Sequence, residues 1–325
     1  MRQRLFEQTY QQELTRFEQK LLYLEGKNKA NEKNLNLSYF AADYRRLCHL
    51  LSLARERQYS SHLIEQLNNL VLRGHQQLYQ RKISLLRNII SFIIIDFPCL
   101  IRREWKFCLA ATAIFYLPAF VLFALVYLNP DLIYSVIPPE MVDGIERMYN
   151  PAAEHIGRDR GAASDIEMLG HYIHNNISIG FRTFAGGILF GLGTLFFLVY
   201  NGIFFGAVSG HIVNISYGST FFPFVVGHAA FELTAITFAG AAGLRLGYAL
   251  IAPGQKTRIH ALRDAASIAI KVIYGVILML LIAAFIEAFW SSRAAIIPSI
   301  KYSVGAFLWL FVLSYFVWAG RRSGT

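Results

Sequence analysis

The stretch from His174 to Gly247 constrains the fold of this chain more than any other. It is too apolar for a soluble domain, yet Asn, His, Glu and Arg recur inside it. In the hydrocarbon of a bilayer, backbone polar groups must be satisfied within helices, and charged side chains need partners. The stretch therefore predicts packed membrane helices whose polar side chains meet one another.

The composition of the whole chain agrees with a membrane protein. Of its 325 residues, 55% are hydrophobic and 16% are charged, a balance typical of integral membrane proteins. The apolar residues concentrate after about Lys106, whereas the part before it is charged and rich in Gln. We expect an all-α fold, namely a polytopic α-helical membrane protein with an N-terminal cytosolic helical bundle.

The net charge of +10 is explained by basic residues that flank membrane spans rather than by a nucleic-acid surface. The sequence has no Arg-rich run with interleaved aromatic residues, so we expect no nucleic-acid partner. Cys48, Cys99 and Cys108 lack the spacing of a metal site, and we expect no structural disulfide among them.

Residues 1–82 are predicted to form the cytosolic domain. Apolar residues at three- and four-residue spacing indicate an amphipathic helix over 1–25, a second from Ser38 and a third from Ser60 or Ser61. Helices of this kind and length form a small bundle around a shared apolar core.

Residues 83–106 are predicted to form an interfacial amphipathic helix. Arg87, Asp96 and Pro98 interrupt its apolar run, which is therefore unsuited to crossing a bilayer. We expect the helix to end near Pro98 and to be followed by basic residues at the depth of the phosphate headgroups.

Residues 107–325 are predicted to form a membrane domain of about six spans. Asn201-Gly202 is a turn signal, expected to separate the second span from a short third one that is either a full crossing or re-entrant. The outer loop 129–177 is acidic, and the segments on the other side are basic, which places both termini in the cytoplasm. The expected spans are residues 107–128, 178–200, 203–215, 221–251, 268–290 and 303–318.

Glycines at four-residue spacing are predicted to pack the helices of this domain. Small residues on one helical face let two backbones approach closely, which is how helices gain contact in lipid. The alternative is that these faces of small residues leave space for a pore or a lipid groove. The glycines concerned are Gly187, Gly191, Gly202, Gly206, Gly210, Gly243 and Gly247.

An intramembrane polar network is predicted around His228 and Glu232, which are four residues apart and share one helical face. The candidate partners of the Glu232 carboxylate are Arg182, Arg245, His211 and Asn214. The network is expected to contain His174, Asn175, Asn176, Asn201, His228 and Glu232.

Three uses of this network are open. It locks the spans together, it lines a polar cavity for a ligand or a proton relay, or His228 and Glu232 are two ligands of a zinc hydrolase. The zinc alternative needs a third ligand, for which His171, His174 and His211 are candidates. The sequence has no HExxH pattern, Walker loop, GxGxxG or nucleophile elbow. The structural lock is therefore favoured, and neither catalytic residues nor a metal or other cofactor is expected.

The same residues resemble the stage II sporulation protein M family. His174-Asn175-Asn176 precedes a Gly-rich segment, Asn201-Gly202 follows it, and His228 and Glu232-Leu233 stand in a helix with a small-residue tail, as in the family pattern. The chain departs from that pattern beside the histidine, where Gly227 and Ala229 stand in place of the usual Pro and Gly. The resemblance extends over nearly the whole chain.

The resemblance implies a multi-pass protein of the bacterial inner membrane. In spore formers such proteins are scaffolds for a peptidoglycan-degrading engulfment complex, and elsewhere they occur beside MoxR-type AAA ATPases and von Willebrand A-type proteins. We therefore expect a non-enzymatic scaffold or assembly protein of a cell-envelope complex, with lipids and these proteins as partners and homo-oligomerisation left open. A small-molecule, lipid or ion transport component that uses the His228/Glu232 region is the alternative, and an intramembrane metal hydrolase is the third reading.

Overall fold

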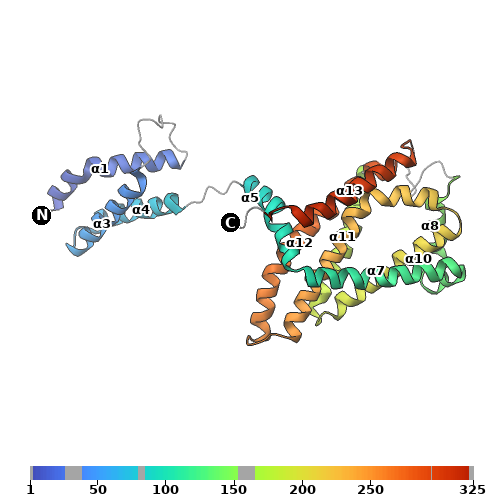
Figure 1. Cartoon of the computed structure of the whole chain (residues 1–325). Coiled ribbons are helices and arrows are strands. Elements are labelled where there is room, and N and C mark those ends of the chain that lie inside the picture. The colour runs from blue at the N-terminus through green and yellow to red at the C-terminus, as the bar shows by residue number, and fades with distance from the viewer. Residues whose placement is uncertain (1–2, 26–38, 80–84, 153–164, 294, 322–325) are drawn as a thin grey trace. The chain divides into compact units, whose positions relative to one another are not determined.

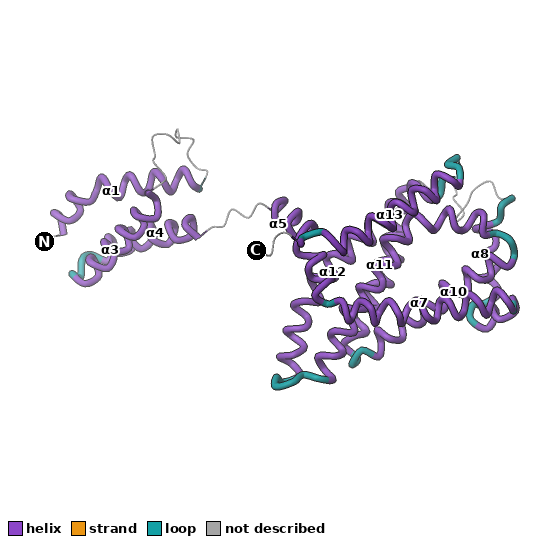
Figure 2. The backbone as a smooth tube through the Cα atoms, in the orientation of Figure 1, coloured by secondary structure: helices purple, strands orange, loops and turns teal. Residues whose placement is uncertain are grey.

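The computed structural model describes residues 3–25, 39–79, 85–152, 165–293 and 295–321. All regular secondary structure in these ranges is helical, which confirms the predicted all-α class (Figure 2). The chain divides into two compact units, an N-terminal unit (Met1–Asn88) and a membrane unit (Ile89–Thr325) (Figure 1).

The N-terminal unit contains, among its described residues, three amphipathic helices that enclose a core of their own. In this core Phe17 stacks on Phe40 with ring centroids 5.2 Å apart. Ser60 caps the third helix, because its hydroxyl accepts a hydrogen bond from the backbone N–H of Leu63. Ser38, predicted to start the second helix, lies outside the described residues. The helices are α1 (Gln3–Leu24), α3 (Phe40–Glu56) and α4 (Ser61–Tyr79).

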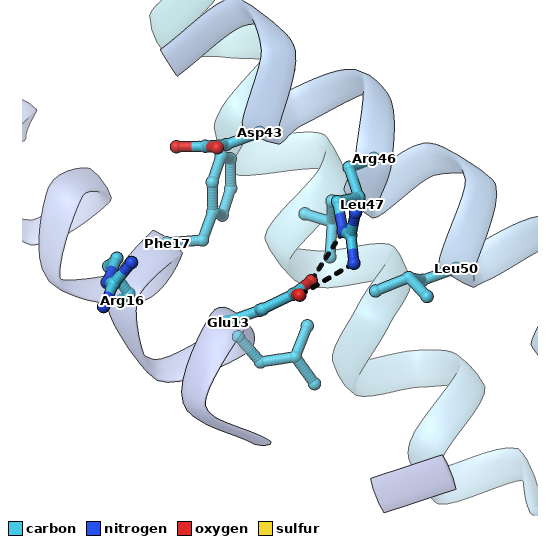
Figure 3. A pocket seen from close by; sticks show the side chains of 8 residues that line it. Glu13, Arg16, Phe17, Asp43, Arg46, Leu47 and Leu50 are labelled. Carbon is cyan, nitrogen blue, oxygen red and sulfur yellow. Dashed lines mark hydrogen bonds and ion pairs between the residues drawn. The ribbon is translucent and has the colours of Figure 1, made fainter. Parts of the chain in front are cut away.

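Ion pairs connect the helices of this unit at its surface. Arg46 on α3 donates hydrogen bonds of 2.7 and 2.8 Å to Glu13 on α1, at a pocket of about 250 Å³ (Figure 3). Arg73 on α4 donates bonds of 2.8 and 3.0 Å to Glu25, and these hydrogen bonds raise the pKa of Arg73 above its usual value. Exposed ion pairs add little to stability, so the apolar core provides most of the stability of the unit.

A continuous helical run leads into the membrane unit: α5 (Leu85–Ser91), the π-helical turn η2 (Phe92–Asp96) and α6 (Phe97–Arg103). The prediction that this helix ends near Pro98 is wrong. Pro98 lies in the first turn of α6, where the N–H that proline lacks has no intrahelical partner to lose. Phe97 and Ile101 are buried in the core of the membrane unit.

Five helices in the described residues are long and apolar enough to cross a membrane. Before α10 comes α9 (Asp165–Ala185), whose first half is polar. Its 21 residues extend about 31 Å at 1.5 Å per residue, which matches a hydrocarbon core of about 30 Å. The five apolar helices are α7 (Trp105–Leu128), α10 (Leu192–Asn214), α11 (Gly218–Ile251), α12 (Arg258–Ile286) and α13 (Pro298–Trp318).

The contacts between α7 and α10 define their relative direction. Gly202, Gly206 and Gly210 face Phe115, Ala119 and Phe123 in that order, so α10 runs parallel to α7. The chain must therefore return between these two helices, and α9 makes that return.

Helix α9 runs antiparallel to α12. Near one end Asp165 accepts a hydrogen bond from Arg293, which follows α12, and further along Gly180 faces Leu280. Val226 and Phe238 of α11 contact Gly305 and Phe316 of α13, so these two helices are parallel. In the described part of the chain, α7, α10 and α12 thus alternate in direction with α9, α11 and α13.

The predicted boundaries of the second and third spans are wrong. The helix breaks at Gly186–Gly191, where η4 (Gly186–Ile188) leads to positive φ angles at Phe190 (54°) and Gly191 (83°). Asn201-Gly202 is no turn but lies within α10, and the Asn201 amide donates to the carbonyl of Phe197 at 2.7 Å. The turn at 186–191 packs closely against α11 because its glycines have no side chains. A Cβ on Gly187 would lie 2.1 Å from the Gly243 carbonyl oxygen.

Both ends of the membrane unit lie on the same side of the helical bundle. The Arg102 guanidinium donates to the carbonyls of Phe316 (2.8 Å) and Ala319 (2.7 Å), and the Tyr315 hydroxyl donates to the carbonyl of Ile93. These contacts join the start of the unit to the last turn of α13.

The opposite end of the bundle is covered by η3 (Pro130–Ser135) and α8 (Pro139–Tyr149). Ile133 and Val142 of this cover pack with Ile212 and Phe221 in a small apolar cluster. The predicted outer loop 129–177 is therefore partly helical, and its last residues belong to α9, because the polar first half of α9 resembles a loop in sequence.

Candidate functional site

The glycines predicted to pack helices lie against the backbones of neighbouring helices. A Cβ on Gly206 would come within 2.1 Å of the Ala119 carbonyl oxygen, and one on Gly210 within 2.5 Å of that of Phe123. Gly187 lies against Gly243, and Gly191 lies against Gly247. These contacts bring α10 to backbone distance from α7, and the turn before α10 to backbone distance from α11.

A pocket of about 230 Å³ lies between these helices. Its walls come from α7, α8, α9, α10 and α11, and most of the lining is aromatic or aliphatic. The polar side chains in the lining are Asn175 of α9, Asn201 of α10, and His228 and Glu232 of α11, together with the Tyr149 ring of α8. Four of the six residues of the predicted network thus line one pocket.

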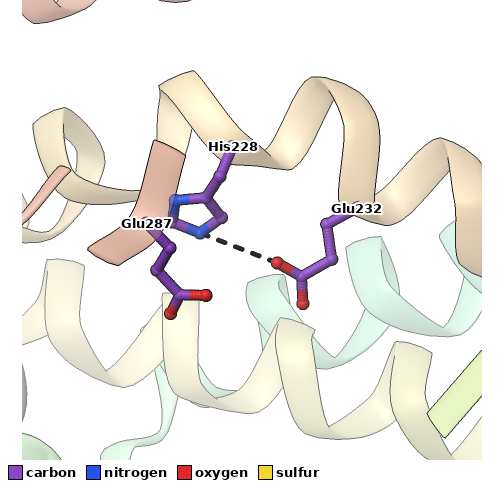
Figure 4. Close-up of side chains that lie close together, drawn as sticks. All are labelled: His228, Glu232 and Glu287. Atoms are coloured by element: carbon purple, nitrogen blue, oxygen red, sulfur yellow. Dashed lines mark ion pairs between the residues drawn. The ribbon is translucent and has the colours of Figure 1, made fainter. Parts of the chain in front are cut away.

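A third ionisable side chain, Glu287, joins His228 and Glu232 from the end of α12 (Figure 4). Glu287 begins η5 (Glu287–Ser291), a π-helical turn that continues α12. The Nε2 atom of His228 lies 3.9 Å from Oε2 of Glu232. One ligand atom from each of the three residues lies within 4.8 Å of the other two.

The imidazole of His228 is held from its other side by the same π-helical turn. Its Nδ1 lies 3.1 Å from the hydroxyl of Ser291. The carbonyl of Ser291 accepts a 2.7 Å hydrogen bond from the ammonium of Lys301 on α13, and both residues are buried. These contacts fix the ring so that Nε2 is directed towards Glu232.

The amides of α9 complete this region. Asn176 is 1% exposed, and its Oδ1 accepts a 3.3 Å hydrogen bond from Asn175. The Asn176 amide lies against the Glu232 carboxylate, but its Nδ2 has no hydrogen-bond partner within normal distance. This buried donor therefore faces the Glu232 carboxylate at more than the normal hydrogen-bond distance.

The other predicted residues lie elsewhere. His174 is exposed on α9 and does not line the pocket. Arg245 binds Glu104 at 2.6 Å, and His211 binds Glu146 at 2.7 Å. Asn214 donates to a backbone carbonyl of α7, and Arg182 is exposed. These four candidate partners therefore do not contact Glu232.

Sequence reasoning missed Glu287, Ser291 and Lys301. The signal was present, because Glu287 is an acid within the apolar run of residues 278–290. An ionisable residue in such a run is by default a candidate functional residue. Its proximity to His228 depends on how α11 and α12 pack, which the spacing of residues along the chain does not show.

The fold and the site define a class of protein: a multi-pass helical membrane protein with an acid–imidazole cluster beside a mainly apolar pocket that contains several polar side chains. A family model for stage II sporulation protein M matches residues 108–292, more than half of the chain, and the chain belongs to this family. The match spans α7 to η5 and so includes the pocket and the three-residue cluster. The predicted family resemblance is confirmed over residues 108–292.

A second family model, described as a domain of unknown function (DUF8413), matches residues 4–80 within the N-terminal unit. No curated protein and no solved structure matches the chain. The function must therefore be argued from the site itself.

Proposed function

We propose that this chain binds a small hydrophilic solute or an ion inside the membrane and acts as a component of a transport system. The observation that carries the proposal is the convergence of Asn175, Asn201, His228 and Glu232 on one pocket. A network that served only to lock helices together would fill the space between its polar groups with side chains, because protein interiors are close-packed. Here the polar groups border a space instead.

The size of the pocket limits what it holds. A volume of about 230 Å³ accommodates several water molecules, but it is below the range of about 300–1,000 Å³ for drug-sized ligands. An ion with part of its hydration shell, or a very small solute, fits this space. A lipid or a peptide would need a larger one.

Whether the pocket contains water is tested by cysteine accessibility. In a chain without its native cysteines, Asn175→Cys and Asn201→Cys should react with a small charged thiol reagent, because the thiolate that reacts forms only in water. Leu195→Cys, on the exposed face of α10 and outside the pocket, is the matched control and should stay unmodified. Equal protection of all three positions would refute a hydrated pocket.

The transport role is tested by flux in native membrane vesicles, where partner subunits are present. We expect Glu232→Gln to abolish flux of at least one cation of a panel (H⁺, Mn²⁺, Zn²⁺) while leaving insertion unchanged. The control is Glu146→Gln, which removes a carboxylate bound to His211 at a site away from the pocket. Wild-type vesicles that carry no flux above empty-vector membranes, or a Glu232→Gln chain that transports normally, would contradict the proposal.

A second candidate function is the scaffold role that the family resemblance implies. The observation in its favour is that the N-terminal unit has its own apolar core, as a docking module requires. Its partners would be envelope proteins, a MoxR-type AAA ATPase and von Willebrand A-type proteins. In a pull-down after mild solubilisation, deletion of residues 1–82 should remove the cytosolic partners. A full-length chain that is a monomer without partners would argue against it.

The bacterial inner membrane with cytoplasmic termini is the proposed location. The end of the bundle at which the membrane unit begins and ends is rich in basic residues, and the opposite end is rich in acidic ones, which is the orientation expected from the positive-inside rule. The basic residues are Arg102, Arg103, Lys106, Lys256, Arg258 and Arg263, and the acidic ones are Asp131, Glu140, Asp143, Glu146, Asp165 and Glu167.

A further inference from the structure

We propose that His228, Glu232 and Glu287 form a three-ligand site for a divalent transition-metal cation of the Zn²⁺ type. The site lies in the wall of the pocket, because His228 and Glu232 belong to both. This inference rests on the proposed function, because it names the class of ligand that the same pocket binds. The choice of a metal ion follows from the chemistry of the three side chains.

The ligand set suits such a cation. One imidazole nitrogen and two carboxylate oxygens are available, all within 4.8 Å of one another (Figure 4). Imidazole favours Zn²⁺ and its neighbours in the transition series over Ca²⁺ or Mg²⁺. Ligand atoms about 2.0–2.2 Å from a tetrahedral Zn²⁺ lie about 3.3–3.6 Å apart. The Nε2–Oε2 distance of 3.9 Å therefore needs only a small side-chain adjustment.

The contacts around His228 prepare the ring for a metal. A ligating histidine normally donates its second ring N–H to a neighbouring acceptor, which fixes the tautomer and the orientation of the ring. The Ser291 hydroxyl, 3.1 Å from Nδ1, is placed to be that acceptor. Nε2 then presents its lone pair on the side of Glu232. Ser291 is itself held by Lys301 through its carbonyl.

The π-helical turn η5 is what brings α12 into the site. It carries both Glu287, a ligand, and Ser291, the group that orients His228. A π-helical turn inserts one residue into the helix, and such turns occur frequently at functional sites.

The buried amide of Asn176 adds a hydrogen-bond donor beside the three ligands. This side chain is 1% exposed, and its Nδ2 faces the Glu232 carboxylate at more than the normal hydrogen-bond distance. A water molecule bound to the cation would accept a hydrogen bond from Nδ2 and remove the cost of the unsatisfied donor.

The charge balance also favours a cation. A carboxylate within the membrane is costly unless a positive charge compensates it. Lys301, which reaches this region from α13, donates its hydrogen bond to the Ser291 carbonyl. A divalent ion would neutralise two carboxylates at once. Three protein ligands leave a fourth position for water, as in open rather than closed zinc sites.

Metal binding to the purified full chain tests the inference. After treatment with a chelator, Zn²⁺ is titrated calorimetrically, and Co²⁺ is used as a spectroscopic probe of the coordination. We expect about one equivalent per chain, with affinity lowered about tenfold or more by Glu232→Gln and by Glu287→Gln. The matched control Glu146→Gln should bind like the wild type. Added Zn²⁺ should also raise the melting temperature of the wild type but not that of the two site variants.

The outcomes separate the metal site from the transport proposal. Absence of stoichiometric binding in the wild type, or binding that survives both site substitutions, overturns the metal site. If the metal binds as expected but Glu232→Gln leaves flux unchanged, the site stands and the transport role fails. If Glu232→Gln abolishes flux although no metal binds, transport stands and the metal site fails.

Discussion

At Gly206, the glycine hydrogen occupies a position where any other residue would place a Cβ atom 2.1 Å from the carbonyl oxygen of Ala119. Neighbouring positions Gly202 and Gly210 have the same relation to Phe115 and Phe123. Lipid tails are as apolar as the helices, so close packing of this kind is a main source of helix association in a bilayer. The contact between α7 and α10 therefore depends on residues without side chains.

Gly206→Ala should destabilise the membrane unit. A methyl group at this position forces α7 and α10 apart, and overpacking of this kind costs about 1–3 kcal/mol. Thermal unfolding in detergent should show a lower midpoint. Gly170→Ala in α9 is the control, because a Cβ there meets nothing within 4 Å and alanine favours the helix. Equal midpoints for the two variants would show that the close contact does not exist.

The candidate site was only partly predictable at the level of residues. The four-residue spacing of His228 and Glu232 places them on one helical face, and the amides Asn175 and Asn201 were identified as polar groups in an apolar region. Glu287 lies 55 residues after Glu232 (287 − 232), so its proximity arises from tertiary packing. His174, predicted to belong to the network, is exposed on α9 and does not line the pocket, because one turn of α9 carries both exposed and buried polar residues.

At the level of elements, the break between α9 and α10 explains why the span boundaries were wrong. Gly187 and Gly191 were predicted to be packing residues in a continuous span, whereas they belong to a turn that also packs against α11. Asn201-Gly202 has the sequence of a turn but lies within α10, because Gly202 is needed for the contact with Phe115. A single sequence does not distinguish a glycine that packs against another helix from a glycine that forms a turn.

The ion pair between Glu104 and Arg245 connects the start of α7 to α11. Their side-chain atoms are 2.6 Å apart, and the Glu104 side chain is 8% exposed. Glu104→Gln would leave the Arg245 charge without its counter-ion, at a cost of about 3 kcal/mol for a pair of this burial. The measurement is the midpoint of thermal unfolding, with restoration expected in a Glu104→Gln, Arg245→Met double variant.

The control for that prediction is the exposed pair of Lys256 and Asp264, whose side chains are 61% and 58% exposed. Asp264→Asn should leave the midpoint nearly unchanged, because exposed ion pairs are screened by water. If Glu104→Gln also leaves the midpoint of thermal unfolding nearly unchanged, the pair does not connect these helices.

At the level of the whole molecule, the described part of the membrane unit contains six long helices in alternating directions besides its shorter ones, and five of the six are apolar enough to be recognised by composition. The prediction of about six spans came from the lengths of the apolar segments and agreed with the charge bias, and α9 was not identified because its first half carries Asp165, Glu167 and His171. The polar residues that lower the hydropathy of α9 are close in sequence to Asn175, which lines the pocket.

Cysteine labelling in sealed vesicles tests whether α9 crosses the membrane. In a chain without Cys48, Cys99 and Cys108, single cysteines replace Asn150, which follows α8, and Gly254, which lies between α11 and α12. With α9 as a crossing, an impermeant reagent should reach these two positions from opposite sides. If α9 did not cross, both positions would be labelled from the same side.

The most direct measurement of the central claim is anomalous diffraction at the zinc absorption edge from crystals of the full chain grown with Zn²⁺. We predict a peak about 2.0–2.2 Å from His228 Nε2 and from one carboxylate oxygen each of Glu232 and Glu287. Zinc bound only elsewhere, with no peak between these three side chains, would contradict the account.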